Sequence, residues 1–168
     1  MILNQEGIGP RMLIDPKRTP GDLLSILEPK IHCIKRENFL YFLEQEVMRA
    51  ERYHFYVSLL LIRSNGADQH SLEELANFLS TQLRTTDYLG IIDEITIGII
   101  ILNAKSENSQ IVLERLKSDF LRAGTRRGPA TKKLAAALAV YPTEANTLRS
   151  LYATALKRLG RRKPLPKD

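Results

Sequence analysis

The spacing of apolar residues divides the chain into short regular stretches. In the stretch 37–53, apolar residues lie three or four positions apart, as on one face of a helix. They are Phe39, Leu43, Val47 and Ala50. The next stretch, 55–62, is a continuous run of aromatic and branched residues that ends at Ser64-Asn65-Gly66. Such a run, bounded by turn residues, predicts a buried strand.

A second helix and a hairpin are predicted next. Ser71 followed by Glu74 is typical of a helix start, and leucines at 72, 75, 79 and 83 share one face of that helix. The stretch LRTTDYLGIIDEITIGIII, residues 83–101, then contains two apolar runs that meet at Asp93-Glu94. Two apolar runs joined by a short polar pair predict a β-hairpin with acidic side chains at its tip.

The last elements are a helix, a strand and a helix. The helix begins at Ser106, with Val112, Leu116 and Phe120 on its apolar face. KLAAALAVY, residues 133–141, is a strand of small residues, and the final helix stops at Gly160. The complete order predicts an α+β fold with a mixed, mostly antiparallel sheet and helices on its faces. Two helix-connected strands that flank a hairpin indicate a ferredoxin-like palm.

Length and composition indicate one globular domain. The chain has 168 residues, of which 43% are hydrophobic and 26% charged. The longest apolar runs, 57–62 and 97–102, are too short to span a bilayer, and the N-terminus does not resemble a secretory signal. We therefore expect a cytoplasmic protein without a membrane span. The only cysteine, Cys33, excludes an internal disulfide and is expected to be a small buried residue.

The net charge of +6 comes largely from two clusters near the C-terminal end of the chain. One brackets the loop around residues 122–133, and the other follows residue 157. Basic clusters attract phosphates, but they also occur at solvated helix ends. Single-strand binders interleave such charges with aromatic residues, which this tail lacks. Nucleic acid is therefore not an expected partner.

Four stretches, in their order and spacing, resemble the diguanylate cyclase (GGDEF) family, whose fold is the nucleotidyl-cyclase palm. IKRENFLYFLEQEVMRAERYHFYVSLLLI is similar to the opening helix and first strand, and RTTDYLGIIDEITIGIIIL to the R-x-x-D segment and signature hairpin. LERLK resembles a helix pattern of the family, and LAAALAVYPTEANTLRSLYATALKRLGRR its closing strand and helix. The resemblance implies a bacterial signalling domain at 31–162, between an N-terminal arm or linker (1–30) and a basic tail (163–168).

The resemblance also implies a degenerate signature. An alignment without gaps puts Gly-Gly-Asp-Glu-Phe on Asp93-Glu94-Ile95-Thr96-Ile97. The two acids then occupy the glycine positions, where the backbone approaches the nucleotide phosphates. Ile95 and Thr96 replace the magnesium ligands. A two-residue deletion before the turn would instead make Asp93 and Glu94 the acids of the signature.

The first strand departs from the family in either alignment. Arg63 stands where the family has a metal-binding aspartate, and an arginine cannot hold a metal ion. The connection from Gly66 to His70 is too short for the family's guanine-recognition segment. The resemblance therefore implies a protein that is not an enzyme, with no catalytic residue, no metal site and no cofactor.

One binding site of the family matches this sequence. Many diguanylate cyclases bind cyclic di-GMP at an inhibitory site that contains R-x-x-D and an arginine from the next helix. Arg84 and Asp87 match R-x-x-D, and Arg115 matches the helical arginine. Guanidinium groups bind phosphates and guanine edges and stack on purines, and a carboxylate accepts from guanine N–H groups. Alternatively, Arg84 neutralises the end of its own helix and Asp87 caps its loop.

A second interpretation needs no small ligand. A palm domain that has lost its catalytic activity can serve as a protein interaction or dimerisation module. It would then bind a protein partner or form a homodimer. Aromatic residues around the first helix are available for such a surface. They are Tyr41, Phe42, Tyr53, His54 and Tyr56.

Overall fold

A computed structural model describes residues 33–64, 69–125 and 134–160. The predicted arm 1–30, the basic tail 163–168, and most of the connection from Gly66 to His70 lie outside the described residues. So do most of the two basic clusters near the C-terminal end.

The order of elements is the predicted one. They are α2 (Arg36–Tyr53), β1 (Val57–Ser64), α3 (Gln69–Gln82), β2 (Tyr88–Asp93), β3 (Thr96–Leu102), α4 (Ser106–Thr125), β4 (Leu134–Tyr141) and α5 (Leu148–Arg158). Helix α3 starts two residues before Ser71, so Ser71 lies inside the helix. None of the described helices is long and apolar enough to cross a membrane.

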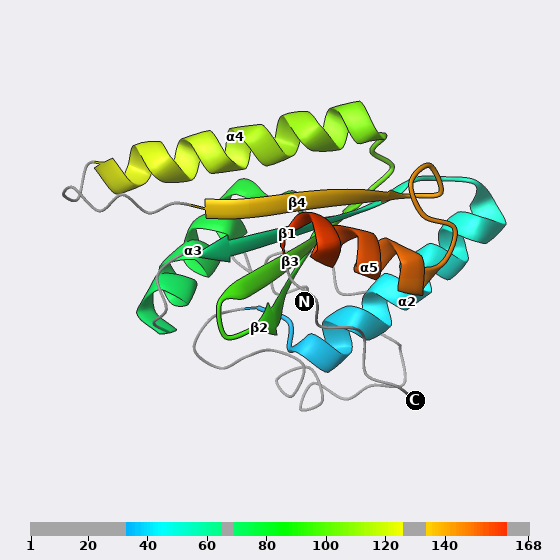
Figure 1. Ribbon diagram of the computed structural model, residues 1–168, viewed down its shortest axis with the longest axis horizontal. Helices are drawn as coiled ribbons and strands as arrows, with labels where there is room; N and C mark the ends of the chain where they lie inside the picture. Colours follow the sequence, from blue (N-terminus) through cyan, green and yellow to red (C-terminus); the bar gives the residue numbers. More distant parts are fainter. Residues whose placement is uncertain (1–32, 65–68, 126–133, 161–168) are drawn as a thin grey trace, which may run out of the picture.

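The four strands form one sheet in the order β2-β3-β1-β4, and each neighbouring pair is antiparallel. A parallel element comes from an isolated bridge between Ile34 and Gly90, at the outer edge of β2. Helices α2 and α5 cover one face of the sheet, and α3 and α4 cover the other (Figure 1). The α+β palm expected from the sequence is confirmed.

Each face of the sheet has its own apolar core, because side chains alternate between the faces along a strand. In β1, Leu59 and Leu61 face α2 and α5, whereas Leu60 and Ile62 face α3 and α4. Cys33 is fully buried, and this burial raises the pKa of its thiol to about 12. The cysteine is therefore a core residue, as expected.

Phe39 of α2 packs directly on two glycines of the sheet. Gly90 of β2 and Gly98 of β3 are cross-strand partners. A Cβ atom added at Gly98 would lie 2.7 Å from Phe39 Cε1, and one added at Gly90 would overlap Phe39 Cδ2 even more closely. Phe39 itself is fully buried. The glycines are thus required by the close approach of the helix to the hairpin.

The hairpin turn contains Glu94 and Ile95, between Asp93 and Thr96. Neither turn residue has positive φ, since the non-glycine residues with positive φ in the described chain are His54 and Asn103. Two-residue hairpins normally use positive φ to match the twist of the strands. Here the register shifts between Ile91 and Asp93, so that Ile92 forms a bulge.

We expect Gly90→Ala to lower the free energy of unfolding by about 1–3 kcal/mol, the usual cost of overpacking a core. Chemical denaturation would measure the change. Phe39→Leu in the same chain should recover part of the loss, because a smaller side chain vacates the space of the new methyl group. Strictly additive effects of the two substitutions would contradict the packing described above.

Candidate functional site

The R-x-x-D segment forms a closed turn between α3 and β2. The backbone N–H of Asp87 donates to the carbonyl of Arg84 at 3.1 Å. The Asp87 carboxylate accepts from the backbone N–H of Arg84 through Oδ2, at 3.0 Å. Asp87 therefore caps its own loop, which was one of the two roles that the sequence allowed. The side chain of Arg84 is exposed, whereas Asp87 is only 5% exposed.

Arg115 approaches this turn from α4. Burial raises the pKa of the Asp87 carboxyl, and the hydrogen bond from Arg84 and the positive charges of Arg84 and Arg115 act in the opposite direction. Both guanidinium groups are therefore close enough to Asp87 to act on its charge. Arg115 on α4 therefore lies near the turn that holds Arg84 and Asp87, so the three predicted residues, which come from two separate segments of the chain, share one region.

Neither arginine is held in a strong pair of its own. Among the described residues, no ion pair joins a carboxylate to Arg84 or Arg115. Asp119, the nearest candidate on α4, instead pairs with Arg122 at 3.7 Å. Both guanidinium groups lie in exposed residues. They are thus available to an anionic ligand in solution.

The residue after the turn anchors it to the core. Tyr88 is 2% exposed, and its hydroxyl donates to Glu46 Oε1 of α2 at 2.8 Å. Glu46 is itself buried and also accepts from Arg49 at 3.0 Å. The phenol stacks on Phe42, with ring centroids 5.5 Å apart. This anchor was not predicted from the sequence, because a glutamate within a helix normally indicates a solvated position.

The positions that the resemblance assigns to a cyclase centre lie at the end of β1 and at the hairpin. Arg63 is the cross-strand partner of Thr96, which is fully buried. The Arg63 guanidinium turns toward α5 and donates to the carbonyl of Leu159 at 3.2 Å, at the C-terminal end of that helix. A cation is favourable there because it opposes the helix dipole.

One of the two acids of the hairpin also takes part in local structure. Asp93 Oδ1 accepts from the backbone N–H of Ile95 at 3.0 Å, so this carboxylate caps the turn. Within the described residues, no three side chains of His, Cys, Asp or Glu gather closely enough to hold a metal ion.

Arg115→Gln should raise the pKa of Asp87 further, because it removes one of the two positive charges that act on the carboxyl. A carboxyl-detected NMR titration would measure this pKa. Arg122→Gln is the matched control, since Arg122 lies on the same helix but pairs with Asp119. An equal response to the two substitutions would mean that Arg115 does not face the turn.

Comparison with known proteins rests on the fold. No family model matches the sequence. No curated protein matches it either. Among solved structures, the GGDEF domain of FimX from Pseudomonas aeruginosa has a TM-score of 0.67 at 15% identity, over 80% of this chain and 91% of that chain.

Two further GGDEF domains are similar to the same extent. That of DgcB from Caulobacter crescentus, solved in complex with c-di-GMP, has a TM-score of 0.66 at 12% identity, over 83% of this chain and 94% of that chain. The active GGEEF domain of a diguanylate cyclase from Vibrio cholerae has a TM-score of 0.63 at 14% identity, over 76% and 88% of the two chains. The protein therefore has the fold of a GGDEF domain.

Proposed function

We propose that this chain is a degenerate, cytoplasmic GGDEF-family signalling domain that binds cyclic di-GMP at Arg84, Asp87 and Arg115. The observation that carries the proposal is that two exposed arginines, Arg84 and Arg115, both lie near enough to one buried carboxyl to lower its pKa. Among the described residues, neither arginine forms an ion pair with a carboxylate. A dianionic nucleotide supplies the negative charge for such pairs.

The three side chains have different roles in this proposal. Arg84 and Arg115 bind the phosphates and the acceptor edge of a guanine, for which a planar guanidinium with several donors is suited. Asp87 mainly stabilises the turn rather than contacting the ligand. One of its oxygens accepts from the Arg84 backbone N–H, and its side chain is nearly inaccessible. It keeps the turn closed so that Arg84 starts from a fixed backbone. The structure supports this role beside the direct guanine contact expected from the sequence.

We also propose that the domain makes no cyclic di-GMP. Phosphoryl transfer by this fold needs carboxylates that hold metal ions near the nucleotide. Arg63, at a position where the resemblance implies a metal ligand, is directed to the carbonyl of Leu159. Asp93 caps the hairpin turn. Both groups therefore have structural partners that differ from a metal ion.

The alternative function, a protein interaction or dimerisation module, is favoured by one surface. Tyr41, Met48 and Tyr53 of α2 are 51%, 56% and 66% exposed. Phe42, by contrast, is a core residue that stacks on Tyr88. The α2 surface and Arg115 of α4 lie on opposite faces of the sheet. A protein partner can therefore bind to α2 whether or not a nucleotide is bound at the arginines.

Isothermal titration of the full chain with cyclic di-GMP should show saturable binding. Arg84→Ala and Arg115→Ala should each weaken it by about tenfold or more, since a hydrogen bond to a charged group contributes ~1.5–3 kcal/mol. Arg122→Ala should leave the affinity unchanged and controls for the loss of one positive charge on α4. If saturating nucleotide produced neither heat nor a thermal shift, binding of cyclic di-GMP would be ruled out. The protein interaction module would then be the remaining function.

Incubation with GTP and Mg²⁺, followed by chromatography, should yield no cyclic di-GMP, because no cluster of carboxylates is present at the hairpin in the described residues. The GGEEF domain from Vibrio cholerae, described as active, is the positive control. Formation of product by the pure protein, abolished by Asp93→Asn, would overturn the assignment of an inactive domain.

A further inference from the structure

Strand β4 forms one edge of the described sheet. Successive residues of an antiparallel strand direct their backbone groups alternately to the two sides. Side chains bond the carbonyl of Leu138 and the N–H of Val140, so these residues face away from β1. Leu134 and Ala136 have the same alternation and also face outward. The outer edge of β4 therefore consists of residues 134, 136, 138 and 140.

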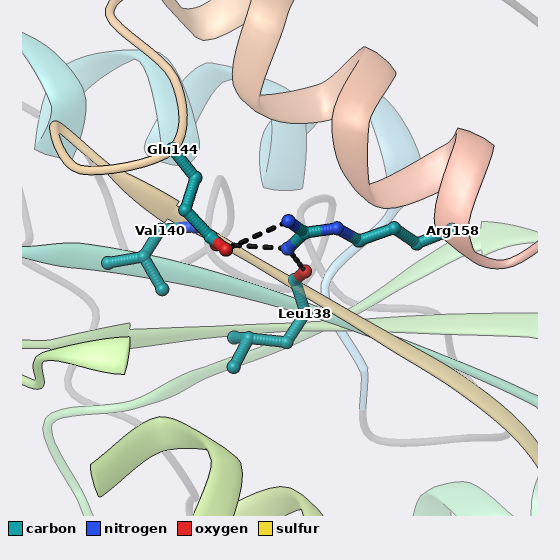
Figure 2. A network of polar contacts seen from close by, with 4 residues as sticks. All are labelled: Leu138, Val140, Glu144 and Arg158. Atoms are coloured by element: carbon teal, nitrogen blue, oxygen red, sulfur yellow. Dashed lines mark hydrogen bonds and ion pairs between the residues drawn. The ribbon is translucent and has the colours of Figure 1, made fainter. Parts of the chain in front are cut away.

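A clamp of two side chains covers the second half of this edge (Figure 2). Arg158 of α5 pairs with Glu144 at 2.8 Å and also donates to the carbonyl of Leu138. Glu144 accepts from the backbone N–H of Val140 at 2.9 Å, and its own N–H donates to the Val140 carbonyl at 2.8 Å. The pairing lowers the pKa of Glu144, so the clamp stays charged at neutral pH.

The first half of the edge is open within the described residues. No described group bonds the backbone of Ala136 on its outer side. A groove of about 300 Å³ runs along this part of the strand, with Gln110, Glu114 and Lys117 of α4 on one side and Arg158 on the other. The outward N–H and carbonyl groups of Ala136 lie in this groove without a described partner. Such groups on a strand edge typically pair with the backbone of another extended chain.

The position of α4 decides between two kinds of occupant. The helix packs mainly over β4 itself (Figure 1). If two copies paired their β4 edges, their α4 helices would lie about as far apart as the strands, ~5 Å. Packed helices need roughly 8–10 Å. A second copy is thus excluded from full edge pairing, whereas a single extended segment without a helix above it fits.

The charges of the groove indicate the composition of the segment. Glu114 pairs with Lys117 at 3.3 Å on the α4 side, and Glu144 pairs with Arg158 on the other side. Each charge is already matched, so a charged segment finds no counter-charge and would have to be desolvated without compensation. The groove therefore favours an uncharged segment.

We propose that the open edge of β4 at Ala136 binds an extended segment of a partner protein, composed of uncharged residues, which adds a fifth strand beneath α4. The segment would pair with the protein through backbone hydrogen bonds, and its alternate side chains would enter the groove. This surface is independent of the arginines of the proposed nucleotide site.

Selection of random short peptides on the full-length protein tests the proposal. Peptides composed of uncharged residues should be enriched over charged ones. Ala136→Pro should weaken them by about tenfold or more, because proline removes the outward N–H, which corresponds to ~1.4 kcal/mol. Proline is tolerated on edge strands at such positions, so the variant should fold. Ala136→Ser keeps the N–H and is the matched control, with unchanged affinity.

Hydrogen exchange on the unmodified protein gives an independent measurement. A bound peptide should slow the exchange of the Ala136 amide while amides of β2 stay unchanged. Failure to enrich any peptide, equal binding to the proline and serine variants, or unchanged exchange at Ala136 would each overturn the proposal. A concentration-dependent dimer that Ala136→Pro abolishes would overturn it too, in favour of a second copy of the chain.

Discussion

The packing of Phe39 against Gly90 and Gly98 sets the distance between α2 and the hairpin, and much of the structure depends on that distance. Because the ring rests on backbone, the helix lies low enough for Glu46 to reach the hydroxyl of Tyr88. Tyr88 in turn fixes the first residue of β2, directly after the R-x-x-D turn. A larger residue at either glycine would lift the helix and break this connection before it touched the site itself.

The two candidate centres of the fold differ in what their arginines contact. At the R-x-x-D turn, a carboxylate is used for backbone capping, and two guanidinium groups remain exposed. At the end of β1, Arg63 reaches the last turn of α5 and stabilises the fold there. The same residue type is thus exposed at one end of the sheet and holds a helix end at the other.

Apolar spacing predicted the elements well because it reflects burial on one face. The helix predicted over 37–53 is α2, and the strand KLAAALAVY is β4 apart from its first residue. Features that depend on distant or conformational partners were not predictable. The bulge at Ile92 follows from the φ angles of the turn, and the clamp joins Glu144 to Arg158 across a loop and a helix. For the candidate site, the sequence indicated the three residues and offered backbone capping as one role of Asp87, but it did not decide between that role and a direct ligand contact.

The bridge between Ile34 and Gly90 has a consequence for the order in which the domain is made. Ile34 and Phe39 lie early in the chain, yet their partners are on β2 and β3, and the central strand β1 has to wait for β4 as well. Contacts between segments so far apart make folding slow and non-local. In a nascent chain that has exposed only α2, β1 and α3, the part of α2 that packs on Gly90 and Gly98 is still uncovered. Such a chain depends on completing its synthesis, or on a chaperone, before it becomes compact.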